Sequence, residues 1–148
     1  MKQKGTIEQC LRELGYVIVP IRGSSMLPLL PEGKSLVKLI PREGQEQGKG
    51  DMVLYQRRDG TRVLHRIIKV TGENTCLVCG DHQWRQKEQI RKDRILAVAQ
   101  GFFRNGRYVD DTTGWYRIYK KIWTGSMPVR RCCLAFLRLS GLEKKYLK

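Results

Sequence analysis

Two residues of this chain have side chains that could work together in acyl transfer, Ser25 and His65. Ser25 lies in a segment of Gly, Ser, Met, Leu and Pro, residues 23–28, which is typical of a tight loop. Such a loop can expose a hydroxyl and leave backbone amides free to stabilise an oxyanion. The residues that we expect to shape the loop and its oxyanion hole are Gly23, Ser24 and Met26. Most loops of this composition are simply turns. A catalytic role for Ser25 therefore requires a base that can reach its hydroxyl.

His65 is the first choice for that base. It lies in a run of apolar and basic residues, 61–70, that predicts a strand. Imidazole has an ordinary pKa near ~6.5, so it can accept a proton at neutral pH. Lys69 is the rival, because residues four apart on a strand share a face, but a lysine base requires burial. A histidine base predicts activity that rises through about pH 6–7.

The order of several short motifs resembles that of signal peptidase I and the SOS-repressor peptidases. The motifs are Gly-Ser-Ser-Met-Leu-Pro at 23–28, Gly-Asp-Met-Val at 50–53, His-Arg-Ile-Ile at 65–68 and Gly-Asp at 80–81. The resemblance covers roughly residues 15–103 and implies a serine endopeptidase with Ser25 as nucleophile. It places His65 where bacterial members have a lysine base, as in the histidine branch of that superfamily. It further implies an extended substrate that adds to a sheet edge, with small side chains at the cleavage site.

The chain departs from the family pattern at three points. Gly23 stands where bacterial signal peptidases often carry a hydroxyl that assists the oxyanion, so the backbone alone must form the hole. The aspartate pair that orients the base in the histidine branch does not follow Gly80; Asp81 is the first candidate for this role and Glu88 the second. The usual N-terminal membrane anchor is not evident, and no run approaches the ~20 apolar residues that span a bilayer.

We expect neither a cofactor nor a metal ion. Cys76, Cys79 and His82 have the spacing of metal ligands. Two cysteines three apart on a strand point to opposite faces, however, and a fourth ligand is not evident. The five cysteines are an odd number without the spacing of a disulfide framework, which favours a reducing compartment.

The elements around these residues predict a mainly β fold, either a small barrel or a folded antiparallel sheet. A short amphipathic helix over 6–14 begins with a capping box, and strand-like runs follow it. The strands are expected at 16–21, 34–40, 51–57, 61–70, 75–79, 95–103 and 107–109. We divide the chain into an N-terminal helix (1–15), a β-rich peptidase domain (16–111) and a basic helical tail (112–148).

The tail carries much of the positive charge. The net charge is +15, and residues 114–148 hold nine Lys and Arg against one Glu. Trp115, Tyr119, Ile122 and Trp123 recur with helical spacing, so Trp115–Leu142 could lie on an anionic membrane surface or pack on the β core. We expect a cytoplasmic protein, peripheral at the inner face of the membrane. The alternative function is a catalytically silent β domain whose tail binds a membrane or nucleic acid, although no nucleic-acid-reading motif is visible.

Overall fold

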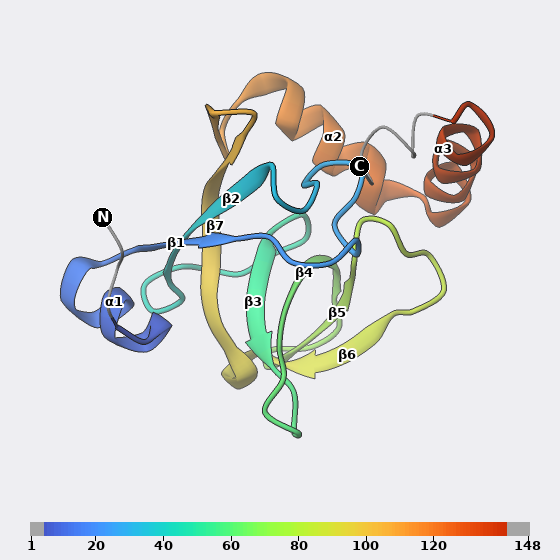
Figure 1. Ribbon diagram of the computed structural model, residues 1–148. Coiled ribbons are helices and arrows are strands. Elements are labelled where there is room, and N and C mark those ends of the chain that lie inside the picture. Colours follow the sequence, from blue (N-terminus) through green and yellow to red (C-terminus); the bar gives the residue numbers. More distant parts are fainter. Residues whose placement is uncertain (1–4, 142–148) are drawn as a thin grey trace.

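A computed structural model describes residues 5–141, and the fold is mainly β. Eight strands form one antiparallel sheet in the order β1-β2-β7-β3-β4-β5-β6, with β8 paired to β7. The strands are β1 (Val17–Pro20), β2 (Ser35–Pro41), β3 (Met52–Gln56), β4 (Arg62–Val70), β5 (Thr75–Cys79), β6 (Glu88–Arg91), β7 (Ile95–Arg104) and β8 (Arg107–Asp110). The helices are α1 (Ile7–Leu14), α2 (Gly114–Gly125) and α3 (Met127–Leu139), with a 3-10 turn at Lys92–Arg94. The sheet curls without closing, so of the two expected forms the folded sheet is the one observed (Figure 1).

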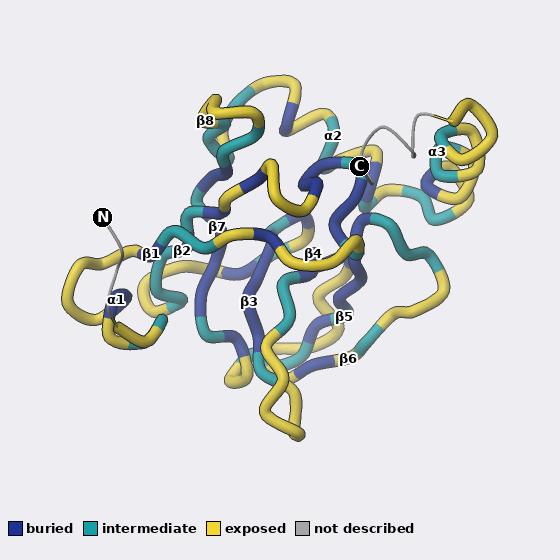
Figure 2. Tube along the Cα trace, viewed as in Figure 1, coloured by how far each residue is buried: buried dark blue, intermediate teal, exposed yellow. Residues whose placement is uncertain are grey.

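The curled sheet has a core on each face. Met52 and Leu54 of β3 belong to one cluster, together with residues of α1, β1, β2 and α2. Val53 and Tyr55 belong to the other cluster, which lies inside the curl of β3, β4, β5 and β6. The two-residue alternation of a strand therefore explains why β3 is buried along its length (Figure 2).

The expected elements agree with the structure except at one strand. Thr6 caps α1 with the predicted capping box, and Gly15 ends it with a left-handed φ of 77°. The strand β6 was not predicted, because its four residues contain a single apolar side chain, Ile90. The omission matters, since Glu88 is the first residue of β6.

The helix α2 is part of the core and not a separate tail. Tyr116 and Trp123 are buried, and Phe102 of β7 packs edge-on against the Tyr116 ring. The expected apolar face is divided, because Tyr119 and Trp123 point toward the sheet while Trp115 and Ile122 are exposed. The proposed boundary at residues 111/112 is therefore corrected: a chain that ends at Asp111 would expose the core that α2 covers. Residues 1–4 and 142–148 of the two outer segments lie outside the described residues.

Candidate active site

Ser25 lies in a turn that is fixed to the core by its neighbour. Met26 is almost fully buried, whereas Ser25 is half-buried. Gly23 adopts a left-handed φ of 77°, and the Leu27 amide closes the turn on the Ser24 carbonyl at 3.1 Å. The backbone amides of Ser25 and Met26 donate no hydrogen bond within residues 5–141. They are therefore available for the oxyanion role that the loop sequence suggests.

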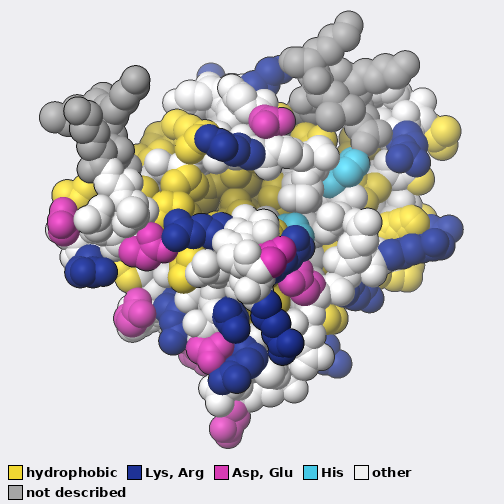
Figure 3. Space-filling view, turned by 60° about the horizontal axis from the view of Figure 1, so that its bottom comes forward, with side chains coloured by type: hydrophobic (Ala, Val, Ile, Leu, Met, Phe, Trp, Pro, Cys, Tyr) yellow, Lys and Arg dark blue, Asp and Glu magenta, His cyan; other side chains and the backbone are white. Residues whose placement is uncertain are grey.

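An apolar groove of about 460 Å³ leads to Ser25. One wall is the end of β1 and the residues after it, Val19–Arg22, and the other is the start of β4, Arg62–Leu64. Within the described sheet, β1 pairs with β2 alone, and residues 62–65 of β4 pair with β3 alone. Both walls thus carry unpaired strand edges, to which an extended peptide can add as a further strand. The space-filling view shows a hollow lined by hydrophobic side chains with Lys and Arg around it (Figure 3).

Gly80 lies in close contact with Ser25. A Cβ built on Gly80 would lie 2.5 Å from the Ser25 carbonyl oxygen and 3.1 Å from the Ser25 Cβ, so Ser25 rests directly on this glycine. Gly80 directly follows Cys79, the last residue of β5, and Cys79 pairs with Arg66, the residue after His65. Ser25 thus packs against the residue that follows the strand paired with the second half of β4.

Among the described residues, no hydrogen bond joins the Ser25 hydroxyl to His65. Contacts between a nucleophile and its base are often long in a free enzyme and shorten when substrate binds. Contact between Ser25 and His65 therefore stays a prediction for the substrate-bound enzyme.

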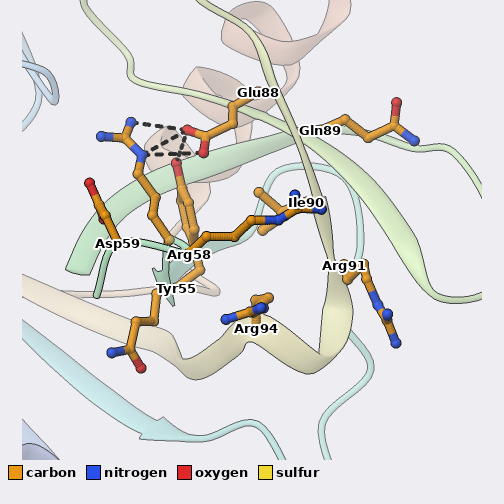
Figure 4. A pocket seen from close by; sticks show the side chains of 10 residues that line it. Tyr55, Arg58, Asp59, Glu88, Gln89, Ile90, Arg91 and Arg94 are labelled. Atoms are coloured by element: carbon orange, nitrogen blue, oxygen red, sulfur yellow. Dashed lines mark hydrogen bonds and ion pairs between the residues drawn. The ribbon is translucent and has the colours of Figure 1, made fainter. Parts of the chain in front are cut away.

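His65 is buried, 4% exposed, and its other ring nitrogen is held by Tyr55. The Tyr55 hydroxyl donates to Glu88 Oε2 at 2.7 Å and lies 3.3 Å from His65 Nδ1. Because the hydroxyl has one proton and gives it to the carboxylate, its oxygen accepts from Nδ1–H. This assignment leaves Nε2 of His65 unprotonated, as a base requires. Arg57 in turn donates to both Glu88 oxygens at 3.0–3.2 Å (Figure 4).

Burial sets the charge state of this base. Desolvation, assisted by the positive charge of Arg57, lowers the pKa of His65 to about 4. The negative charges of Glu88 and Asp81 oppose this shift but do not cancel it. His65 is consequently neutral at physiological pH, which is the form that can accept a proton.

Glu88 remains ionised beside Tyr55. Partial burial acts to raise the pKa of its carboxyl, but hydrogen bonds from Arg57 and Tyr55 outweigh burial and hold that pKa below its ordinary value. Desolvation and the Glu88 hydrogen bond raise the pKa of Tyr55, so the phenol keeps its proton. The hydrogen-bonded chain from His65 through Tyr55 to Glu88 therefore has a neutral phenol next to an ionised carboxylate.

The structure corrects the first choice of orienting acid. Both oxygens of Asp81 are engaged elsewhere, at 2.8 Å from Nε and Nη2 of Arg66, and Tyr119 donates to Oδ2 at 2.9 Å. Asp81 makes no hydrogen bond to His65, because its side chain is directed toward α2. Glu88, the second choice, is the acid that is linked to the imidazole, and the link passes through Tyr55.

Lys69 is poorly placed to act as the base, and the cysteines are poorly placed to bind a metal ion. Lys69 is exposed, because the ladder between β4 and β5 shifts register between Ile67 and Lys69 and interrupts the alternation that would put Lys69 beside His65. Cys76 lies in the inner core, and burial raises the pKa of the thiols of both Cys76 and Cys79. Within residues 5–141, no three His, Cys, Asp or Glu side chains are grouped as metal ligands would be.

Residue types and spacing did not point to Tyr55, Arg57 or the contact of Gly80 with Ser25. Tyr55 could have been found from the hairpin, because it pairs with Val63, two residues from His65 on the same face. The Arg57–Glu88 contact joins residues 31 apart and depends on the curl of the sheet, which no local pattern reports.

Comparison with protein-family models, with curated proteins and with solved structures finds no match to this chain. The site is therefore interpreted from its own geometry.

A change at Tyr55 tests the link to Glu88. In Tyr55→Phe, the Nδ1–H of His65 loses its buried acceptor, so we expect kcat to fall about tenfold. Tyr16→Phe, which removes a hydroxyl from an exposed ring outside the site, is the matched control. Steady-state kinetics on a cleaved peptide measure both variants. Unchanged kcat in Tyr55→Phe would show that the phenol does not orient the base.

Proposed function

We propose that this chain is a serine endopeptidase, related to signal peptidase I, that cleaves an extended peptide or leader segment through Ser25 and His65. One observation carries the proposal: Ser25 stands in an apolar groove between two unpaired strand edges, and one of these strands, β4, carries the buried, neutral His65. A groove with unpaired edges suits a peptide main chain, and the Ser25 loop supplies the hydroxyl and the free amides.

The reaction follows from these positions. The Ser25 oxygen attacks the scissile carbonyl carbon while Nε2 of His65 takes the hydroxyl proton. The carbonyl oxygen becomes an oxyanion that the Ser25 amide and a neighbouring amide can stabilise. The imidazolium returns its proton to the departing amine, which leaves an ester on Ser25. Water, deprotonated by His65, then hydrolyses the ester and restores the enzyme.

The groove also indicates which substrates fit. Its lining is largely aliphatic and includes Ile7, Val19, Ile21, Leu54 and Leu64. Peptides with apolar residues on the acyl side of the bond are therefore expected to react. A defined peptide mixture, analysed by mass spectrometry after incubation with wild-type protein and with Ser25→Ala, tests this expectation. Cleavage by the wild type alone, after apolar or small residues, supports it; no cleavage of any peptide favours the alternative of a silent β domain with a basic binding surface.

The pH dependence follows from the burial of His65. Protonation removes the base, so activity is lost as pH falls through the pKa of the free enzyme. With that pKa at about 4, kcat/KM should be flat at neutral pH and decline only in acid, below the range of about pH 6–7 expected for an ordinary histidine. A profile of kcat/KM against pH measures this. A limb at pH 6–7 would mean that the imidazole is solvated, and a rise continuing above pH 9 would point to Lys69.

The proposed location is the cytoplasmic face of a membrane. None of the helices within residues 5–141 is long and apolar enough to cross a bilayer. Peripheral association through basic and apolar surface residues is the form of membrane contact that the proposal includes.

A further inference from the structure

The helices α2 and α3 carry large apolar side chains that remain exposed to solvent. On α2, Trp115, Ile118 and Ile122 follow one another at i, i+3 and i+7, and Ile118 is 61% exposed. They form a second stripe, distinct from Tyr116 and Trp123, which face the sheet. The tube view shows the outer side of both helices as largely exposed (Figure 2).

The same pattern continues on α3. Its exposed apolar residues Val129, Phe136 and Leu139 lie on one side of the helix, and the last two are 67% and 88% exposed. Its buried residue is a charged one, Arg130. Leu134 and Leu137, at i+4 and i+7 from Arg130, are half-buried, so α3 has apolar side chains on its outer side in addition to those near the protein. Several large apolar groups on adjoining helices indicate a surface with a partner.

The charge of the two helices identifies the kind of partner. From Gly114 to Leu139 the chain has six Lys and Arg and no Asp or Glu. The basic residues are Arg117, Lys120, Lys121, Arg130, Arg131 and Arg138. Lys120 and Arg130 bond inward, to Asp111 and to backbone carbonyls, while Arg117, Lys121, Arg131 and Arg138 are exposed beside the apolar stripes.

A groove beside α3 adds an aromatic anchor. It has a volume of about 470 Å³ and is lined by Trp84, Met127, Pro128, Cys132 and Ala135, with Arg85 and Arg131 at its rim. Both guanidinium groups lie over the Trp84 ring, at 4.8 and 5.1 Å from its centroid. The right-hand edge of the space-filling view shows hydrophobic and basic side chains side by side (Figure 3). Tryptophan flanked by arginine is a combination suited to the headgroup region of a bilayer.

We infer that the outer sides of α2 and α3, together with Trp84, form a docking surface for an anionic lipid bilayer. Apolar side chains among basic ones, with acidic residues excluded, match the apolar interior and negative headgroups of such a membrane. A second copy of this chain fits less well, since two surfaces of the same positive sign would repel each other. This inference rests on the proposed membrane location and names the surface responsible for it, whereas its test does not require peptidase activity.

Hydrogen bonds connect α3, which carries part of the docking surface, to the loop that contains Ser25. Arg130 of α3 donates to the carbonyl oxygens of Gly80 and Gln83, both at 3.0 Å. Between Gly80 and Gln83, the backbone amide of His82 donates to the Ser25 carbonyl oxygen at 2.9 Å. Bilayer contact through α3 would thus hold the groove in a fixed orientation to the membrane, so that a membrane-bound peptide meets Ser25 in one geometry.

Vesicle co-sedimentation of the full-length protein tests the inference. We expect binding to vesicles of phosphatidylglycerol and phosphatidylcholine, weaker binding at high salt, and none to phosphatidylcholine alone. Arg117→Gln with Lys121→Gln should weaken binding by about fivefold for each charge removed. Ile118→Ser, Phe136→Ser and Leu139→Ser combined should weaken it at least about tenfold. These residues are exposed, so folding should be preserved, which circular dichroism checks.

Matched variants elsewhere separate this surface from charge and hydrophobicity in general. Arg58→Gln with Arg107→Gln removes two exposed charges, and Leu14→Ser with Val70→Ser removes exposed apolar side chains; all four sites lie outside the surface. Wild-type binding by both controls is the expected result. Protein that stays in the supernatant with anionic vesicles at low salt overturns the inference, as does wild-type binding by the apolar triple variant. Dimerisation abolished by that triple variant, without lipid binding, would assign the face to a second copy.

Discussion

Peptide turnover is expected to fall by at least about a thousandfold in both Ser25→Ala and His65→Ala. The first variant removes the attacking oxygen and the second removes the group that takes its proton. Because the two act in one step, the double variant should be no slower than the slower single variant. Single-turnover kinetics with a cleaved peptide measure all three.

Lys69→Ala is the control for the base, since Lys69 lies on the same strand but is exposed. It should retain wild-type turnover. His65→Gln accompanies His65→Ala, because it fills more of the buried site and keeps a fold defect from being taken for a catalytic one. If Lys69→Ala is inactive and His65→Gln is not, the base is misassigned.

Asp81→Ala is expected to lower the free energy of unfolding by about 3–5 kcal/mol. Arg66 and Asp81 are both fully buried, and the change leaves the Arg66 guanidinium without its bidentate partner. Tyr119 loses its acceptor as well, so the contact of α2 with the sheet weakens. Urea denaturation followed by circular dichroism measures the effect.

The role of Asp81 is separated from catalysis by its comparison with Glu88. Asp81→Asn should lose stability while the remaining folded protein keeps its kcat, whereas Glu88→Gln should lose kcat with little loss of stability. Asp59→Ala, an exposed loop carboxylate, is the control for the general effect of removing a negative charge. Stable but inactive Asp81→Asn would restore Asp81 as the orienting acid.

Local patterns predicted most of the fold. Alternation, the Asp59-Gly60 and Asn105-Gly106 turns and the capping box at Thr6 are signals that neighbouring residues carry, and the corresponding elements are present. The strand β6 has no such signal. The burial of α2 was also not evident, since its sequence has two apolar stripes and the pattern cannot say which one meets the sheet.

The candidate site was predictable in part. Residue types and motif order favoured Ser25 and His65, and the structure places Ser25 against Gly80, which follows the strand paired with β4. Direct contact between Ser25 and His65 stays a prediction. The choice between Asp81 and Glu88 required three-dimensional contacts, because both are acids downstream of His65. Arg66 forms an ion pair with Asp81, 15 residues away in the sequence. Tyr55 contacts both His65 and Glu88. Sequence spacing predicts neither contact.

Labelling of Ser25 by a fluorophosphonate probe is the most direct test of the proposed dyad. We expect native protein to be modified at Ser25, as located by peptide mass spectrometry. Unfolded protein, Ser25→Ala and His65→Gln should not be modified, while Lys69→Ala should be modified at the wild-type rate. Native protein that remains unlabelled, or that is labelled equally in His65→Gln, would contradict the assignment of Ser25 and His65 as nucleophile and base.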